Sequence, residues 1–144
     1  MAERRSRRQK QFLAERAGFR CEYCRTPVGL TPSPYSAEHI VPRSLGGAST
    51  ADNLALSCQG CNGHKAAKAV APDPATGLMV RLFNPRRENW REHFDWTEDG
   101  IRVEGKTAVG RATVIALQLN RPGLQNLRRL MVFAQIHPPE QIKD

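Results

Sequence analysis

The sequence predicts an α+β fold in one small domain that is held together by a metal, and three observations support this. The 144 residues are enough for one hydrophobic core. Hydrophobic residues make up 40% of the chain and charged residues 25%, as in globular proteins. Two similar cysteine pairs enclose a pattern of strand, loop and strand, and a helical pattern follows the second pair.

We expect three segments. Residues 1–20 form a basic N-terminal helix, residues 21–71 form the core with both cysteine pairs, and residues 72–144 form an extension of a small sheet plus helices packed on the core. The stretch SRRQKQFLAERAGF predicts the first helix, with Phe12, Leu13 and Ala17 on an apolar stripe and Gly18 near its end.

The charge of the chain indicates an anionic partner. The formal net charge is +8 and the sequence pI is about 9.9, which favours nucleic acid or an acidic lipid surface. The excess is concentrated in the first 25 residues, which hold eight Lys or Arg and three acids. The basic face of the predicted helix would lie along a DNA backbone, or would simply be a solvated surface.

The apolar stretches are short and interrupted by charges, and no apolar segment follows the arginine-rich start. We therefore expect no membrane partner and a cytoplasmic protein. In a reducing compartment, paired cysteines hold a metal more often than they form disulfides.

The cysteine pairs have the spacing of a zinc site. CEYC contributes Cys21 and Cys24, and CQGC contributes Cys58 and Cys61. Four thiolates fill the tetrahedral coordination of zinc and leave no position for water, so this Zn²⁺ would be structural. The alternative is free or disulfide-bonded cysteines.

Between the pairs, YSAEHIVP predicts a strand ended by Pro42, and NLALSC predicts a second strand. A wide loop containing Gly46 and Gly47 would join them into a hairpin. The alanines and lysines of NGHKAAKAVA then favour a helix that runs until Pro72.

These residues resemble the HNH nucleases, or ββα-metal nucleases, in their four-cysteine zinc form. The resemblance is carried by CEYCR, EHIVPRSLGG, DNLALSC and CNGHK, in the family's order and approximate spacing. Further on, LFNPRRENWREHFDW and GRATVIALQLNRPGLQNLRR are similar to small stand-alone bacterial HNH proteins. The resemblance implies a zinc-stabilised ββα-metal (His-Me finger) core.

The resemblance also implies roles for four residues. Glu38 would be a metal ligand, His39 the general base, Asn53 the residue that ties down the loop after the histidine, and Asn62 the second protein ligand. The acid is more familiar as aspartate in this family. Oxygen ligands on an open, hydrated ion suit Mg²⁺ or Mn²⁺.

Each role has a structural alternative. On a strand, Glu38 and His39 point to opposite faces, so only a break in pairing or a helix packed across the hairpin would bring both to one site. His39 would otherwise be held by backbone groups, Glu38 would be a solvated strand residue, Asn53 a turn residue and Asn62 a helix N-cap.

Basic residues near this motif would line the path of the phosphate backbone. Lys65 and Lys68 lie three positions apart on the predicted helix, and with Arg43 they would contact phosphates, or they would be ordinary solvated side chains. His64 diverges from Asn62 on a helix by roughly 200° and is left out of the catalytic set.

The last half of the chain predicts support elements. GLMVRLFNP indicates a strand, and HFDWTEDGIRVEGKT indicates a hairpin that turns at Asp99–Gly100. Two helices are indicated by AVGRATVIALQLN and LQNLRRLMVFAQI, and the first of them would be closed by Asn120 and Pro122. The strand and the hairpin suggest one added sheet. The expected core residues are Trp90, Phe94, Trp96, Leu124 and Leu127.

The function predicted from sequence is that of a metal-dependent endonuclease that hydrolyses DNA phosphodiester bonds, with RNA not excluded and no small-molecule cofactor. The alternative is a zinc-stabilised nucleic-acid-binding module without catalysis. The sequence does not indicate a DNA sequence preference or a biological role. It leaves open whether one strand or both strands are cut, and whether the protein is a monomer or a homodimer.

Overall fold

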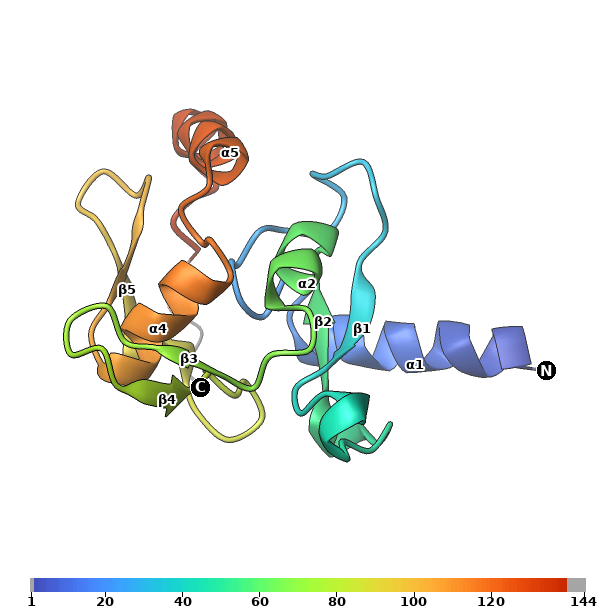
Figure 1. The fold of residues 1–144 in the computed structure, drawn as a ribbon. Coiled ribbons are helices and arrows are strands. Elements are labelled where there is room, and N and C mark those ends of the chain that lie inside the picture. The colour runs from blue at the N-terminus through green and yellow to red at the C-terminus, as the bar shows by residue number, and fades with distance from the viewer. Residues whose placement is uncertain (1, 140–144) are drawn as a thin grey trace. The chain divides into compact units, whose positions relative to one another are not determined.

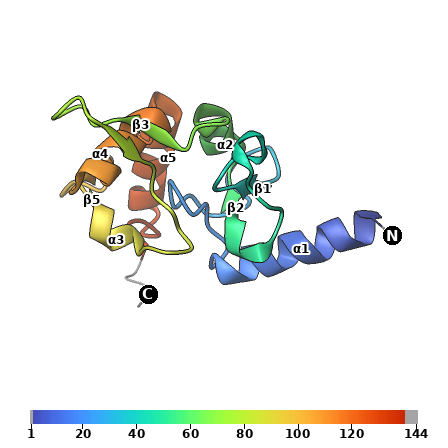
Figure 2. The ribbon, with the colours of Figure 1, turned by 60° about the horizontal axis from the view of Figure 1, so that its bottom comes forward.

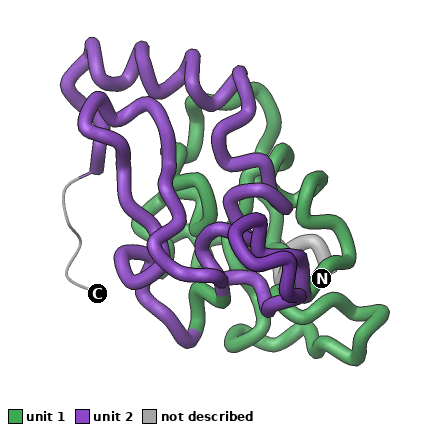
Figure 3. The backbone as a smooth tube through the Cα atoms, turned by 60° about the vertical axis from the view of Figure 1, so that its left-hand side comes forward, with its two compact units in different colours: residues 1–69, 84–86 green, residues 70–83, 87–144 purple. Residues whose placement is uncertain are grey.

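The computed structural model describes residues 2–139, and their side chains from residue 7 onward. Residues 1 and 140–144, which the predicted N-terminal helix and C-terminal extension include, lie outside the described residues. The chain forms two compact units (Figure 3), one of residues 1–69 and 84–86 and the other of residues 70–83 and 87–144. Each unit is described by itself below.

The first unit contains an N-terminal helix, a hairpin and a short helix. Its elements in chain order are α1 (Ala2–Arg16), β1 (Ser36–His39), two 3-10 turns (Arg43–Leu45 and Ala51–Asn53), β2 (Leu54–Ser57) and α2 (Gln59–Lys65).

Helix α1 lies within the segment predicted to be a basic helix and packs beside the β1–β2 hairpin (Figure 1). Leu13 and Ala17 are buried against the hairpin, whereas Phe12 remains half exposed beneath the Arg16 guanidinium. Of the three residues on the predicted apolar stripe, Leu13 and Ala17 are therefore buried and Phe12 is not. Arg16 also donates to the Ala51 and Leu54 carbonyls at 2.8 and 2.6 Å, which joins the end of α1 to the start of β2.

The predicted hairpin is confirmed. Strands β1 and β2 lie side by side (Figure 2) and pair antiparallel. Glu38 is opposite Ala55 and His39 is opposite Leu54. Every residue of β2 is buried, because α1 and the cysteine-bearing segments cover it. The pairing continues one step beyond the strand, since the Ile40 amide donates to the Asn53 carbonyl at 2.9 Å.

Helix α2 begins at the second cysteine pair and is shorter than predicted. It ends at Lys65, because Ala66 has a φ of +49° that turns the chain out of the helix. Residues 70–72 form a strand instead of the last helical turn, so the prediction of a helix reaching Pro72 is wrong. Helix propensities of a few tenths of a kcal/mol per residue are easily overridden by strand pairing.

Up to residue 139, the second unit contains two separate hairpin sheets and three helices. Its elements are β3 (Val70–Pro72), β4 (Met79–Arg81), α3 (Trp90–His93), β5 (Phe94–Trp96), β6 (Val103–Gly105), α4 (Ala108–Ala116) and α5 (Pro122–Phe133).

The hairpin turned at Asp99–Gly100 is confirmed as β5 and β6. The predicted strand in residues 77–85 is present as β4, but β4 pairs with β3 rather than with that hairpin, so one added sheet was the wrong expectation. Pro122 does not close α4. It opens α5, where its fixed φ and missing N–H suit the first helical turn.

Aromatic packing forms the core of this second unit. Trp90 lies with its ring centroid 5.1 Å from those of both Phe94 and Trp96, and Leu124 is buried as predicted. Leu127 is only partly buried. The described residues thus form a mixed α/β protein with small two-stranded sheets and five α-helices.

Candidate functional site

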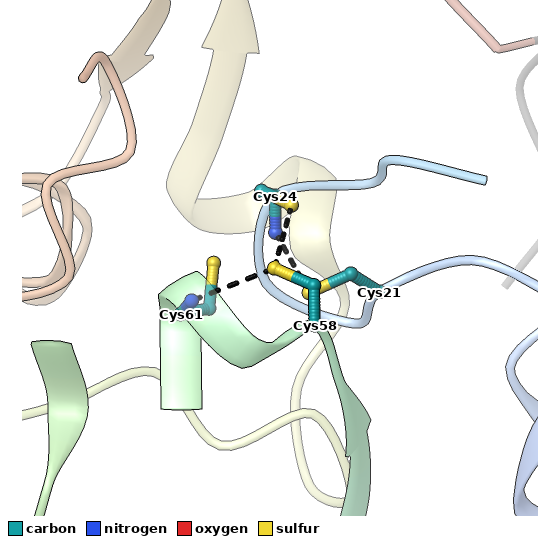
Figure 4. A group of neighbouring side chains, drawn as sticks. All are labelled: Cys21, Cys24, Cys58 and Cys61. Atoms are coloured by element: carbon teal, nitrogen blue, oxygen red, sulfur yellow. Dashed lines mark hydrogen bonds between the residues drawn. The ribbon is translucent and has the colours of Figure 1, made fainter. Parts of the chain in front are cut away.

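The four cysteines converge in the first unit. Cys21 and Cys24 lie on the loop after α1, Cys58 follows β2, and Cys61 lies in α2 (Figure 4). All four are buried, and their sulfur atoms lie within 4.8 Å of one another. The Cys24 and Cys58 sulfurs are 3.7 Å apart. Four sulfurs bound at about 2.3 Å around one zinc ion would lie roughly 3.8 Å apart, so this geometry fits zinc.

Backbone amides support the cysteine sulfurs. The Cys24 amide donates to the Cys21 sulfur and the Cys61 amide donates to the Cys58 sulfur, at 3.5 and 3.4 Å. Hydrogen bonding with Cys21 lowers the pKa of the Cys58 thiol, whereas burial raises the pKa of the Cys21 thiol. Four buried cysteine sulfurs that converge on one point are the donor set of a structural metal such as zinc.

Glu38 lies inside the first unit with only 4% of its surface exposed. One carboxylate oxygen, Oε1, accepts a bond from the Lys65 ammonium at 2.6 Å, and the other, Oε2, accepts one from the Tyr23 hydroxyl at 2.6 Å. Burial, and then the neighbouring carboxylate, raise the pKa of Tyr23 well above its usual value. Tyr23 is consequently a neutral donor to the Glu38 side chain.

His39 is the last residue of β1 and is half buried. Its Nε2 lies 2.9 Å from the Ser49 hydroxyl, and the structure gives Nδ1 no hydrogen-bond partner among the described residues. Glu38 and His39 point to opposite faces of β1, as expected for neighbouring residues on a strand. The Glu38 side chain contacts buried groups, whereas the His39 side chain contacts a serine of the following loop.

Asn53 fixes the loop that follows the histidine. Its side-chain oxygen accepts from the Val41 amide at 2.9 Å, and its side-chain nitrogen donates to the Val41 and Ala48 carbonyls at 3.0 and 2.8 Å. Gly47 packs into the same turn, where an added Cβ would lie 1.8 Å from the Val41 carbonyl oxygen. The loop is therefore closely packed and held by the side chain of Asn53.

Asn62 lies in the middle of α2 and is partly exposed, with no side-chain hydrogen bond to the described residues. Its amide group is consequently able to accept a further ligand. It is not the N-cap, because Cys58 occupies that position and accepts from the Cys61 amide. His64, also partly exposed, stays outside the candidate site.

The structure separates the three basic residues predicted to contact phosphates. Arg43 and Lys68 are exposed. The Lys65 side chain is 1% exposed and paired with Glu38, so the prediction that Lys65 contacts a phosphate at the surface does not fit this structure. Lys68 lies beyond the end of α2 and thus does not share a helical face with Lys65.

Sequence reasoning did not identify Tyr23, Ser49 or the interior role of Lys65. Buried lysines are rare unless paired, and the partner of Lys65 is 27 positions away. The signal for Tyr23 was its place within the first cysteine pair, because any side chain there is held close to the metal site.

Residues 21–68 match the model of the family described as HNH endonuclease, which confirms the resemblance and identifies an HNH domain in this segment. The match covers about one third of the chain. The searches of curated proteins and of solved structures gave no match.

An HNH domain indicates a nuclease-type or nucleic-acid-binding role, with nucleic acid as its partner. Members of this family are typically endonucleases. Within residues 2–139 no helix is both long enough and apolar enough to cross a membrane.

Proposed function

We propose that this protein is a metal-dependent endonuclease that hydrolyses phosphodiester bonds of DNA, with His39 as the general base. The observation that carries the proposal is the arrangement at the end of β1. His39 lies there within the HNH segment, and Asn53 holds the following loop by three hydrogen bonds. A fixed loop keeps the imidazole in one place, which general-base catalysis requires.

The proton chemistry follows from the imidazole contacts. In the tautomer with its proton on Nε2, His39 would donate to the Ser49 hydroxyl and leave Nδ1 to accept a proton from water. Ser49 would then stabilise the orientation of the ring as it becomes charged.

Asn62 and Glu38 are the proposed ligands of a divalent cation, Mg²⁺ or Mn²⁺, which would neutralise charge on the phosphate. Asn62 is partly exposed and has acceptor capacity. An ionised carboxylate has about four acceptor positions, and Lys65 and Tyr23 use two of those of Glu38. Arg43 and Lys68 are proposed to contact the DNA backbone.

A second candidate is a zinc-stabilised nucleic-acid-binding module without catalysis. The engagement of Glu38 favours it, because an ammonium already neutralises the carboxylate that would hold the cation. The two functions predict the same fold and the same anionic partner, and they differ only in bond cleavage.

Incubation of the zinc-loaded protein with covalently closed supercoiled plasmid, in Mg²⁺, Mn²⁺ or EDTA, distinguishes the two. We expect conversion to nicked or linear DNA that requires added cation and stops in EDTA. A protein that retards the plasmid in a gel but leaves it supercoiled under every condition would support the binding module instead.

A further inference from the structure

We propose that Lys65 positions His39, by holding the end of β1 from inside the first unit. This inference rests on the proposed function, in which His39 is the base. Lys65 is a positioning residue, because its ammonium contacts the backbone and Glu38 rather than the reacting groups.

The ammonium of Lys65 makes three hydrogen bonds at one end of β1. Its Nζ lies 2.6 Å from Glu38 Oε1, 3.1 Å from the His39 carbonyl and 2.9 Å from the Ile40 carbonyl. These acceptors use all three ammonium hydrogens. The backbone on the C-terminal side of His39 is therefore fixed directly to α2.

A second donor reaches Glu38 from the other cysteine-bearing segment. Tyr23 lies between Cys21 and Cys24 and donates to Glu38 Oε2 at 2.6 Å, while Lys65 lies four residues after Cys61, one helical turn away. Both donors are attached to the segments that the cysteine site draws together. Through them, the metal site that holds the fold also sets the place of the histidine.

Stability alone is a weak reason for this arrangement. Buried ion pairs often contribute no more than apolar residues of similar volume, since desolvation offsets their attraction. The arrangement does provide three directed bonds at the residue whose position matters most. A displacement of about 1 Å at a reacting group can cost on the order of 100-fold in rate.

Lys65→Met tests the proposal, with Gln59→Ala as a matched control. Gln59 also joins α2 to the β1 region, but at the far end, where its side chain donates to the Pro34 carbonyl and the Ser36 hydroxyl at 2.8 and 2.7 Å. Both variants remove hydrogen bonds between the same two parts of the fold. Only Lys65→Met releases the end that carries His39.

For zinc-loaded Lys65→Met we expect kcat for plasmid cleavage to fall on the order of 100-fold, with DNA affinity little changed. Gln59→Ala should keep kcat near the wild-type value. Equal kcat for Lys65→Met and wild type, or an equal loss in both variants, would overturn the proposal.

The position of the imidazole can be measured without cleavage, by ¹H–¹⁵N spectra of the histidine rings. The His39 ring resonances should shift in Lys65→Met and stay in place in Gln59→Ala. If the wild type does not cut DNA, the proposed function fails, and these spectra still decide whether Lys65 positions His39. Unchanged His39 resonances in Lys65→Met would contradict the positioning role whatever the activity.

Lys65→Met leaves a buried carboxylate without its cation, so Tyr23→Phe provides a milder variant. It removes one hydroxyl and keeps the ion pair. We expect a smaller shift of the His39 resonances and a loss of kcat on the order of five-fold, the effect of one hydrogen bond. If neither variant moves these resonances, the proposal is wrong.

Discussion

Glu38 accepts hydrogen bonds from a phenol and an ammonium while only 4% of its surface is exposed. A carboxylate in this position stabilises the packing of the first cysteine pair and α2 on β1. The resemblance to HNH nucleases assigns the same carboxylate to a divalent cation. These roles are separable, because one is measured by unfolding and the other by cation affinity.

Glu38→Gln separates the two roles. The free energy of unfolding should fall by about 3–5 kcal/mol, because the variant leaves the Lys65 ammonium buried without its partner charge. Mn²⁺ affinity, measured by electron paramagnetic resonance on folded protein, should fall at least ten-fold, roughly the effect of disturbing a metal site.

The exposed Glu98→Gln is the charge-matched control for this change and should alter neither quantity. Mn²⁺ affinity equal to wild type in Glu38→Gln would show that Glu38 serves the fold alone.

At the scale of elements, hydrogen bonds and a positive-φ glycine fix the loop between β1 and β2. The Gly47 amide donates to the Pro42 carbonyl at 3.0 Å, and Gly46 has a φ of +89°, a conformation that favours glycine. Asn53 closes the loop from its far end. The wide Gly-Gly loop is thus an ordered support for His39.

Gly47→Ala should disrupt this loop, because its Cβ would overlap the Val41 carbonyl. We expect a loss of about 1–3 kcal/mol in the free energy of unfolding, typical of overpacking, and faster hydrogen exchange of the Val41 amide. Gly63→Ala is the control, since its Cβ meets open space in α2 and should be neutral or stabilising. Unchanged exchange at Val41 in Gly47→Ala would contradict the described packing.

The elements also explain which parts of the fold could be predicted. Local signals were sufficient for the β1–β2 hairpin and for the turn at Asp99–Gly100, because alternation and turn residues lie within a few positions of one another. The end of α2 could not be predicted, since Ala66 and Lys68 have good helix propensity. The helix nevertheless ends at Lys65, where Ala66 turns out of the helical conformation, and residues 70–72 pair with β4 as a strand.

The same reasoning applies to the candidate site. The cysteine pairs could be recognised from their spacing alone, and the resemblance indicated Glu38, His39, Asn53 and Asn62. The contacts of Tyr23 and Lys65 depend on distant parts of the chain that meet only after folding. The spacing of residues in the sequence does not indicate such long-range contacts.

At the scale of the whole molecule, the four cysteines and the proposed catalytic residues all lie in the first unit. Among the described residues, the cysteines form the one group of three or more His, Cys, Asp or Glu side chains arranged to hold a metal ion. In the second unit, the Asp73–Arg111 ion pair joins the end of β3 to α4. Asp73 accepts two bonds from Arg111, whose guanidinium holds the pKa of that carboxyl well below its usual range.

The chain has a formal net charge of +8, which favours an anionic partner such as DNA. A basic protein attracts the DNA backbone without regard to sequence, and an affinity of this kind falls as salt rises. DNA binding by itself would therefore not distinguish a nuclease from a binding module. The two are distinguished by whether the protein cleaves DNA and whether cleavage requires His39.

The most direct measurement is the cleavage rate of saturating supercoiled plasmid by wild type, His39→Ala and His64→Ala, each with one zinc per chain and the same circular dichroism spectrum. His39→Ala should cut about 10² to 10⁴ times more slowly while binding DNA equally well, and His64→Ala should cut like wild type. Wild-type rates in His39→Ala would contradict the assignment of His39 as the base.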